Sequence, residues 1–293
     1  MTAKFIKANP NFIAVCNNGF IQTYKDGTIN TQQIGTAFWT SIAYGNGKYV
    51  AVGYSGYTTS STDGMIWTTP KKVGTDDWNA ITFGLGRFMT VGKNGYVTSS
   101  TDGINWSVPT QPEAGRSYVG VTFGDGKFVT LCEGGSYCFI STNGATWDGF
   151  GNIFMKTSSS ARTIGYGNGK FFSFGASNSE GCRVNTSTDG YNWKTQNDAE
   201  QLYIDSVDGI AYGNGVFVAI AGFWYITSTD GESWIWDRKA IDDVYPNLTC
   251  LSFGNGYFVT GGDKGAIFIS SDGKDWNRID NNSTESINAV YAY

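Results

Sequence analysis

Short runs of apolar and alternating residues recur along the chain, and glycine, asparagine or aspartate separates each run from the next. The clearest repeat contains four runs, at residues 39–44, 48–52, 57–60 and 66–68, with turns at 45–47, 53–56 and 63–64. Runs of four to six residues bounded by such turns are typical of β-strands, because Asn and Gly accept the positive φ that a tight hairpin requires. The pattern therefore predicts a unit of four short antiparallel strands.

The turn before the fourth run belongs to a motif, which reads Ser61-Thr62-Asp63-Gly64-Met65-Ile66-Trp67 in this repeat. Its Asp or Asn recurs at positions 26, 63, 102, 143, 189, 230 and 272, so successive differences are 37, 39, 41, 46, 41 and 42. The first copy, around Asp26, is degenerate. A strand-rich repeat of about forty residues predicts a β-propeller. Seven copies predict an all-β, seven-bladed propeller of four-stranded antiparallel blades.

The blades together form one domain over residues 1–293. Six complete blades are predicted at residues 38–69, 77–108, 117–148, 161–195, 206–236 and 247–278. The seventh is divided between the chain ends, about 1–30 and 285–293. Its inner strand is predicted at Ile287-Asn288-Ala289-Val290, although Phe5-Ile6 competes for that place. Sharing one blade between the two ends closes the ring and removes exposed strand edges.

The motif residues are predicted to be structural. The Asp or Asn side chain accepts backbone N–H bonds within its own turn, Gly takes a left-handed conformation, and Trp packs over the turn. The acidic or amide positions are Asp26, Asp63, Asp102, Asn143, Asp189, Asp230 and Asp272, and the rings are Trp67, Trp106, Trp147, Trp193, Trp234 and Trp276.

The motif resembles the Asp-box, or BNR repeat, in a shortened form in which Gly follows Asp directly. This form is similar to the repeats of photosystem II stability/assembly factor-like propellers and of Asp-box propellers in bacteriophage virion and tail proteins. The resemblance covers nearly the whole chain. It implies a propeller whose motif lies away from any active centre, and it does not select a function.

Alternation of antiparallel strands places both tight turns, Gly-x-Gly and Asp-Gly, on one face of the ring. The two looser connections of each blade then lie on the other face, where the loops at 69–77, 108–117, 148–160, 195–206, 237–247 and 278–286 differ from blade to blade. Because loops on a rigid scaffold commonly carry function, we expect any binding surface on this variable face. The alternative is that these loops are merely unconstrained.

Two groups of aromatic residues are candidate ligand-binding residues. Trp39, Trp78 and Tyr118 occupy the same repeat position at the loop-face start of three inner strands, and Phe223-Trp224-Tyr225 lies at a connection between the second and third strands of its blade. Exposed rings at a rim suit stacking on sugar rings. The alternative is that the first three rings pack into the neighbouring blade.

Composition excludes several classes of function. The net charge is −5 and no Lys/Arg cluster exists, which argues against nucleic acid as a partner. The chain has no His, and its five Cys form no Cys-x-x-Cys pair, so neither a zinc site nor His-dependent catalysis is expected. Cys16, Cys132 and Cys250 align with small residues of other repeats and are expected to be buried. No cofactor is expected.

The N-terminal sequence lacks the apolar core of a signal peptide, and no apolar run is long enough to cross a bilayer. We therefore expect synthesis in the cytoplasm, with incorporation into a virion as an open route.

The sequence favours a non-enzymatic recognition or assembly module, for example in a phage particle, that binds a cell-surface glycan or a neighbouring virion protein through the variable face. One alternative is a purely structural scaffold. The other is a glycoside hydrolase, which would need two carboxylates across a cleft. Loop acids are plentiful but nothing in the sequence pairs them, and Asp242-Asp243 is expected to be solvated surface rather than a Ca²⁺ site.

Overall fold

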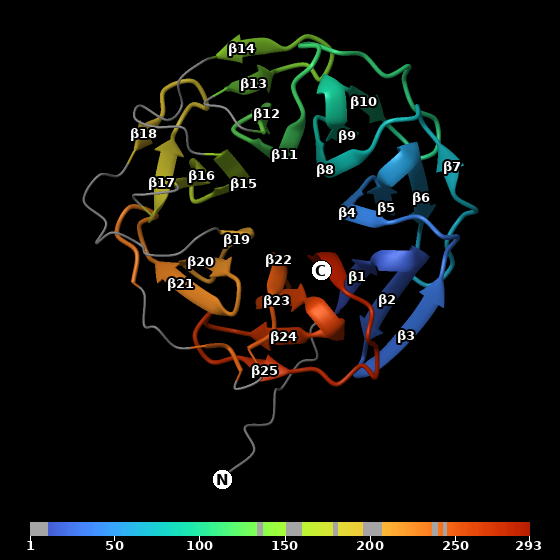
Figure 1. Ribbon diagram of the computed structural model, residues 1–293, viewed down its shortest axis with the longest axis vertical. Helices are drawn as coiled ribbons and strands as arrows, with labels where there is room; N and C mark the ends of the chain where they lie inside the picture. Colours follow the sequence, from blue (N-terminus) through green and yellow to red (C-terminus); the bar gives the residue numbers. More distant parts are fainter. Residues whose placement is uncertain are drawn as a thin grey trace.

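The computed structural model describes residues 11–133, 137–150, 160–177, 181–195, 207–235, 240–242 and 245–293. Seven antiparallel sheets stand around a central axis like the blades of a propeller (Figure 1). Blade 1 contains β4–β7, blades 2 to 6 follow in chain order, and blade 7 combines β26 with β1–β3. The predicted seven-bladed, all-β fold is confirmed.

Each blade runs from an inner strand outward. The inner strands are β4 (Trp39–Gly45), β8 (Trp78–Gly84), β11 (Tyr118–Gly124), β15 (Ser160–Gly167), β19 (Gly209–Gly213), β22 (Leu248–Gly254) and β26 (Ile287–Ala292). The second strands are β5 (Lys48–Gly53), β9 (Arg87–Gly92), β12 (Lys127–Cys132), β16 (Lys170–Ser177), β20 (Val216–Ala221), β23 (Tyr257–Gly262) and β1 (Phe12–Cys16). The third strands are β6 (Tyr57–Ser61), β10 (Val97–Ser100), β13 (Cys138–Ser141), β17 (Gly181–Ser187), β21 (Trp224–Ser228), β24 (Ile267–Ser270) and β2 (Phe20–Lys25).

The outer, fourth strands are short. They are β7 (Lys71–Lys72), β14 (Asp148–Phe150), β18 (Lys194–Thr195), β25 (Asn277–Arg278) and the longer β3 (Thr28–Gln33). In blades 2 and 5 the described residues show isolated bridges in this place, which are Val97 with Thr110, Trp224 with Ala240 and Thr227 with Ile235. The prediction of an outer strand at 66–68 is wrong, because the Asp63 turn extends through Trp67 before the chain reaches β7 at Lys71.

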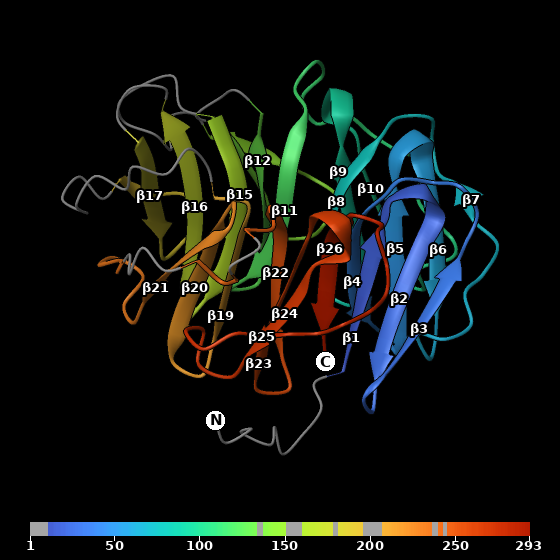
Figure 2. The ribbon, with the colours of Figure 1, turned by 60° about the horizontal axis from the view of Figure 1, so that its bottom comes forward.

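The ring closes as predicted, with the last segment as the inner strand. β26 pairs antiparallel with β1, and Val290 lies opposite Ala14. Figure 2 shows the two strands side by side, with the C-terminus at the lower edge. The competing segment Phe5-Ile6 lies outside the described residues. This pairing joins residues from the two ends of the chain and leaves no open edge between blades 6 and 1.

The hydrophobic core lies between the blades. Side chains of a strand point alternately to its two faces, and here both faces meet a neighbouring blade. In β1, Phe12 and Ala14 pack toward blade 6, whereas Ile13 and Val15 pack toward blade 1, and all four are fully buried. This is why the second strands are continuous apolar runs rather than alternating ones. Seven such clusters fill the seven interfaces, including the one that closes the ring.

Four connections between second and third strands are single 3₁₀ turns rather than loose loops. They are η1 (Asn17–Gly19), η2 (Tyr54–Gly56), η3 (Lys93–Gly95) and η4 (Asp263–Gly265). Each has its middle residue at φ 55 to 57 and its Gly at positive φ. The connection expected to be looser than the hairpins is therefore a defined turn in these four blades, and the variation is concentrated in the connections between blades.

Candidate functional site

The repeated motif forms a closed turn that leaves little for a ligand to bind. In blade 1, one carboxylate oxygen of Asp63 accepts the backbone N–H groups of Met65 and Ile66, each at 2.8 Å. The Ser61 hydroxyl donates to the same carboxylate oxygen at 3.0 Å and accepts the Gly64 N–H at 2.9 Å. The Trp67 indole N–H donates to the Gly64 carbonyl at 3.1 Å. These residues satisfy one another, as a scaffold requires.

The other copies share this geometry. The side-chain oxygen of Asn143 accepts the N–H groups of Ala145 and Thr146 at 2.8 and 2.9 Å, so an amide oxygen accepts the same pair of bonds as a carboxylate oxygen. Backbone N–H groups from Ser233 and Glu232 lower the pKa of Asp230 to about 2, and those from Asn105 and Ile104 hold the pKa of Asp102 well below its usual range. A lowered pKa fits a carboxylate that is held ionised, not an acid that exchanges protons.

Asp26 does not repeat this turn, and its assignment to the motif is wrong. Asp26 and Gly27 have φ of 50 and 82, and Lys25 pairs directly with Thr28. This is a two-residue hairpin turn with positive φ at both positions, which suits Asp-Gly. Because β2 and β3 continue to each side of it for six residues, the outer strand of blade 7 is longer than the others.

The predicted arc of exposed rings is also wrong. Trp39, Trp78 and Tyr118 have exposed fractions of 0%, 1% and 0%. A Cβ on Gly53 would lie 3.1 Å from the Trp39 ring, so the ring packs on the second strand of its own blade. Gly92 stands in the same relation to Trp78, at 3.0 Å. The rings fill the loop-face end of the core and offer no surface to a sugar.

The backbone carbonyls of these three residues connect the blades. Thr40 donates to the Trp78 carbonyl at 2.7 Å, and Asn79 donates to the Tyr118 carbonyl at 2.7 Å. Asn288 donates to the Trp39 carbonyl at 2.7 Å, so the same kind of inter-blade hydrogen bond also crosses the closing interface between blades 7 and 1.

The second aromatic group is only partly accessible. Trp224 and Tyr225 belong to β21 itself and not to the connection before it, which is a correction to the sequence prediction. Tyr225 is 3% exposed, and its hydroxyl donates to the Lys274 carbonyl at 3.0 Å in blade 6. Phe223 and Trp224 are half-buried, with Phe223 edge-on to Tyr245 at 5.1 Å. Tyr245, on the next inter-blade loop, is 58% exposed.

On the tight-turn face, side-chain hydrogen bonds connect neighbouring blades. Asn46, in the turn after β4, donates to the carbonyls of Gly86 at 3.0 Å and Thr101 at 2.9 Å, one from each tight turn of blade 2. Asn214 makes the equivalent pair with Gly256 and Ser271 in blade 6. These bonds confirm that the two tight turns share a face. They also occupy backbone groups that a ligand on this face would need.

A second inter-blade contact on this face packs an aromatic ring of one blade against a glycine of the preceding blade. A Cβ on Gly45 would lie 2.1 Å from the Phe83 ring, and one on Gly84 would lie 2.2 Å from the Phe123 ring. Only glycine allows this approach. The same contact joins Gly124 to Tyr166, Gly167 to Tyr212 and Gly213 to Phe253. The sequence shows the signal, an aromatic residue before the first Gly of each Gly-x-Gly turn, but its role was missed.

The loop face carries a preorganised patch over blades 1 and 2, which we call the Tyr54 patch and define as Phe38, Tyr54, Asp77 and Lys93. The rings of Phe38 and Tyr54 stack with centroids 4.6 Å apart and planes 9° apart. Lys93 places its ammonium 5.4 Å from the Tyr54 ring and 2.7 Å from the Asp77 carboxylate. Asp77 also accepts the Ser55 N–H at 2.8 Å. Tyr54 is 38% exposed, so the patch presents an aromatic surface with a fixed charged margin.

Elsewhere on the loop face, Tyr137 is 40% exposed and carries the Arg116 guanidinium 4.1 Å from its ring centroid.

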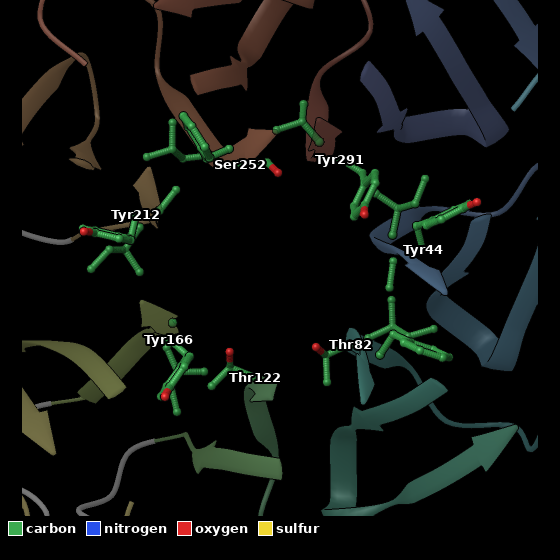
Figure 3. Close-up of a pocket in the computed structure, with 18 residues that line it drawn as sticks. Tyr44, Thr82, Thr122, Tyr166, Tyr212, Ser252 and Tyr291 are labelled. Atoms are coloured by element: carbon green, nitrogen blue, oxygen red, sulfur yellow. The ribbon is translucent and has the colours of Figure 1, made fainter. Parts of the chain in front are cut away.

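A channel runs along the axis of the ring, with a cavity volume of about 470 Å³. Every inner strand contributes to its wall, and each is the terminal strand of its sheet (Figure 3). Its eighteen lining residues include no charged side chain, and hydroxyls come from Tyr44, Thr82, Thr122, Tyr166, Tyr212, Ser252 and Tyr291. The channel was not predicted, because its wall is made of one to three residues from each of seven distant segments.

Several of the described loop acids form ion pairs with basic side chains. Asp77 pairs with Lys93, and Asp242 accepts from Arg278 at 3.0 Å. Asp243, Glu200 and Asp205 lie outside the described residues. Among the residues described, no group of three His, Cys, Asp or Glu is placed to hold a metal ion. The same part of the chain contains no helix that is both long and apolar enough to cross a membrane.

All five cysteines are buried thiols that form no disulfide. Burial raises the pKa of Cys250 to about 12, with smaller opposing effects from hydrogen bonds, and the same cause raises that of Cys138 to about 12. The sequence expectation of small buried residues is confirmed for Cys16, Cys132 and Cys250.

Comparison with known proteins identifies the fold. No protein-family model matches the chain, and no curated protein matches it in sequence. A solved structure described as YCF48 bound to a D1 peptide is 18% identical with a TM-score of 0.65, and the match covers 88% of each chain. YCF48 from Cyanidioschyzon merolae is 15% identical with a TM-score of 0.63, over 88% of this chain and 90% of that one.

A chain from a nidogen/laminin complex is 9% identical with a TM-score of 0.57, over 97% of this chain and 98% of that one. The chain is therefore similar to propellers seen with peptide or protein partners, and identities this low establish the shared fold alone.

Proposed function

We propose that this propeller is a non-enzymatic protein-recognition module, and that its partner docks on the loop face over the Tyr54 patch. The observation that carries the proposal is the stacked Phe38–Tyr54 pair, exposed at Tyr54 and held by the Asp77–Lys93 ion pair. Aromatic residues are enriched at the centres of protein interfaces, where a rigid ring gives a large contact area at a small entropic cost.

The rigidity of the patch supports this proposal. Ser55, beside Tyr54, has φ 57, and its N–H bonds to Asp77 from the next blade. The Tyr54 ring therefore rests on backbone that a second blade holds in place. Binding then orders few groups, which leaves more of the contact energy as affinity. The opposite face offers less to a partner, because side chains from neighbouring blades already occupy backbone carbonyls there.

The similar solved structures support the same kind of partner, since one is described with a bound D1 peptide and another as a complex with laminin. Four of the six rings that suggested a glycan site at the loop-face rim are buried in the core. A place in a virion stays a prediction from the sequence motif. The partner we propose is thus a protein segment that presents an apolar anchor side chain.

The test is quantitative cross-linking and affinity recovery from native extract with three baits: the unchanged protein, Tyr54→Ser and Ile66→Ser. Ile66 is 77% exposed and lies in a tight turn on the opposite face, so its substitution is the matched control. We expect one partner that the unchanged protein and Ile66→Ser recover equally and Tyr54→Ser loses by about tenfold, since interface aromatics commonly contribute 1–2 kcal/mol or more. Equal loss in both variants, or loss with Ile66→Ser alone, contradicts the proposed docking face.

A further inference from the structure

The central channel departs from the sevenfold repeat at one position. Six inner strands carry a small residue where their side chains reach the axis, and the seventh carries Tyr291. The small residues are Ala43, Thr82, Thr122, Gly165, Ala211 and Ser252. The register confirms the equivalence, because Ala43 lies opposite Val50 of β5 and Tyr291 lies opposite Ile13 of β1, the same place in each sheet. At this one position of the wall, a large ring therefore replaces the small side chain of the other six strands.

Tyr291 does not stand alone. Its ring centroid lies 6.0 Å from that of Tyr44 and 5.9 Å from that of Tyr49. Tyr44 is 38% exposed and also lines the channel. Burial raises the pKa of Tyr291, so its hydroxyl stays protonated and able to donate at neutral pH. Together the two tyrosines form an aromatic corner beside the channel, and in Figure 3 the Tyr44 hydroxyl points away from the axis.

Hydroxyl groups project from the wall beside and across from this corner. In Figure 3, Thr82, Thr122 and Ser252 point their hydroxyls toward the axis. Ser252 accepts the Ala292 N–H at 3.3 Å, which leaves its proton free to donate. Within the described residues, the Thr82 and Thr122 hydroxyls have no hydrogen-bonding partner in the protein. Each inner strand also has one backbone edge that pairs with no strand, although side chains of neighbouring blades bond to some of its groups.

The chemistry of this wall selects its ligand. An ion, a phosphate or a carboxylate would need a counter-charge, and the channel wall has none. An aromatic corner beside groups that both donate and accept hydrogen bonds suits a sugar, whose C–H face packs on a ring while its hydroxyls bond around the edge. A volume of about 470 Å³ accommodates a ligand of this size.

We propose that the central channel binds a neutral mono- or disaccharide, which stacks on Tyr291 and Tyr44 and bonds to the hydroxyls of Thr82, Thr122 and Ser252. This site is separate from the Tyr54 patch and does not depend on it. The proposed glycan site therefore lies on the axis of the ring and not at its rim.

The test is saturation-transfer NMR followed by calorimetric titration of the purified full chain with glucose, galactose, N-acetylglucosamine and maltose. Glucosamine and N-acetylneuraminic acid serve as charged counterparts. We expect at least one neutral sugar to bind with a dissociation constant on the order of 1 mM, and the charged ones to bind at least tenfold more weakly. Absence of binding by all four neutral sugars at 20-fold higher concentration, about 20 mM, overturns the proposal.

Three variants locate the site. Thr82→Val keeps the shape of the side chain and removes one hydroxyl, so we expect about tenfold weaker binding. Tyr291→Phe keeps the ring and should retain most of the affinity, whereas Tyr291→Ala should abolish binding. Tyr54→Ser should change nothing, which separates this site from partner docking. If a sugar binds but Thr82→Val and Tyr291→Ala leave its affinity unchanged, the ligand lies elsewhere and the assignment is wrong. Circular dichroism of each variant excludes loss of fold as the cause.

Discussion

The contact between Gly84 and the Phe123 ring leaves no room for a side chain, and Gly84→Ala tests it. A Cβ on Gly84 would lie 2.2 Å from the Phe123 ring. Phe123 cannot retreat freely, because the Phe128 ring packs behind it with centroids 5.0 Å apart. Alanine must therefore push blade 3 away from blade 2 or force Phe123 out of its rotamer.

Overpacking a core by one methyl group commonly costs 1–3 kcal/mol, and the absence of room on both sides places Gly84→Ala at about 3 kcal/mol. For a chain of this size, that free energy corresponds to a fall in melting temperature of about 6 °C. Phe123→Leu removes ring volume at the same contact and should cost about 1 kcal/mol by itself. In the double variant the added methyl group occupies space that the ring vacated.

The assay is thermal unfolding of the four proteins followed by circular dichroism, treated as a double-mutant cycle. We expect the double variant to be more stable than the sum of the single effects predicts, by about 1–2 kcal/mol. The reasoning is refuted if Gly84→Ala unfolds within 1 °C of the unchanged protein, roughly 0.5 kcal/mol. Strict additivity of the two substitutions would equally show that the residues do not touch.

Three further predictions concern the core, the motif and the thiols. Trp39→Ala should lower the free energy of unfolding by about 3–5 kcal/mol, because the ring is 0% exposed; a variant that keeps its melting temperature would contradict this packing. The lowered pKa of Asp230, about 2, means that its ionised form stabilises the fold above about pH 4, and that this contribution is lost as the pH falls toward 2. Asp230→Asn, which copies the turn at Asn143, should therefore flatten the acid limb of a stability–pH curve; an unchanged slope between pH 4 and 2 would refute the linkage. The thiols should react with Ellman's reagent at pH 8 only after denaturation, since burial keeps the pKa of Cys250 near 12; rapid reaction of the native protein would show that a described strand opens.

The architecture was predictable because its signals are local. Gly45-Asn46-Gly47 and Ser61-Thr62-Asp63-Gly64 each define a turn through the conformation and hydrogen bonds of neighbouring residues, and they recur at a regular spacing. Closure was predictable for the same reason, since Ile287 to Val290 matches the pattern of the other inner strands. The assignment of Asp26 to the motif was wrong because the dipeptide Asp-Gly also forms two-residue hairpins. Here no Ser lies two residues before the Asp, whereas the other copies have one.

The repeats and their turns were thus contained in the sequence alone, because each depends on residues within about ten positions of one another. Tertiary structure decided which aromatic side chains are buried and which are exposed. Whether Trp39 faces solvent or core depends on Gly53 and blade 7, and whether Tyr54 is presented depends on Asp77 and Lys93 in the next blade. The channel is the extreme case, since its wall exists only when seven strands from the whole length of the chain stand around one axis. A surface made from distant segments leaves no contiguous pattern in the sequence, and so only the closed ring shows which side chains meet there.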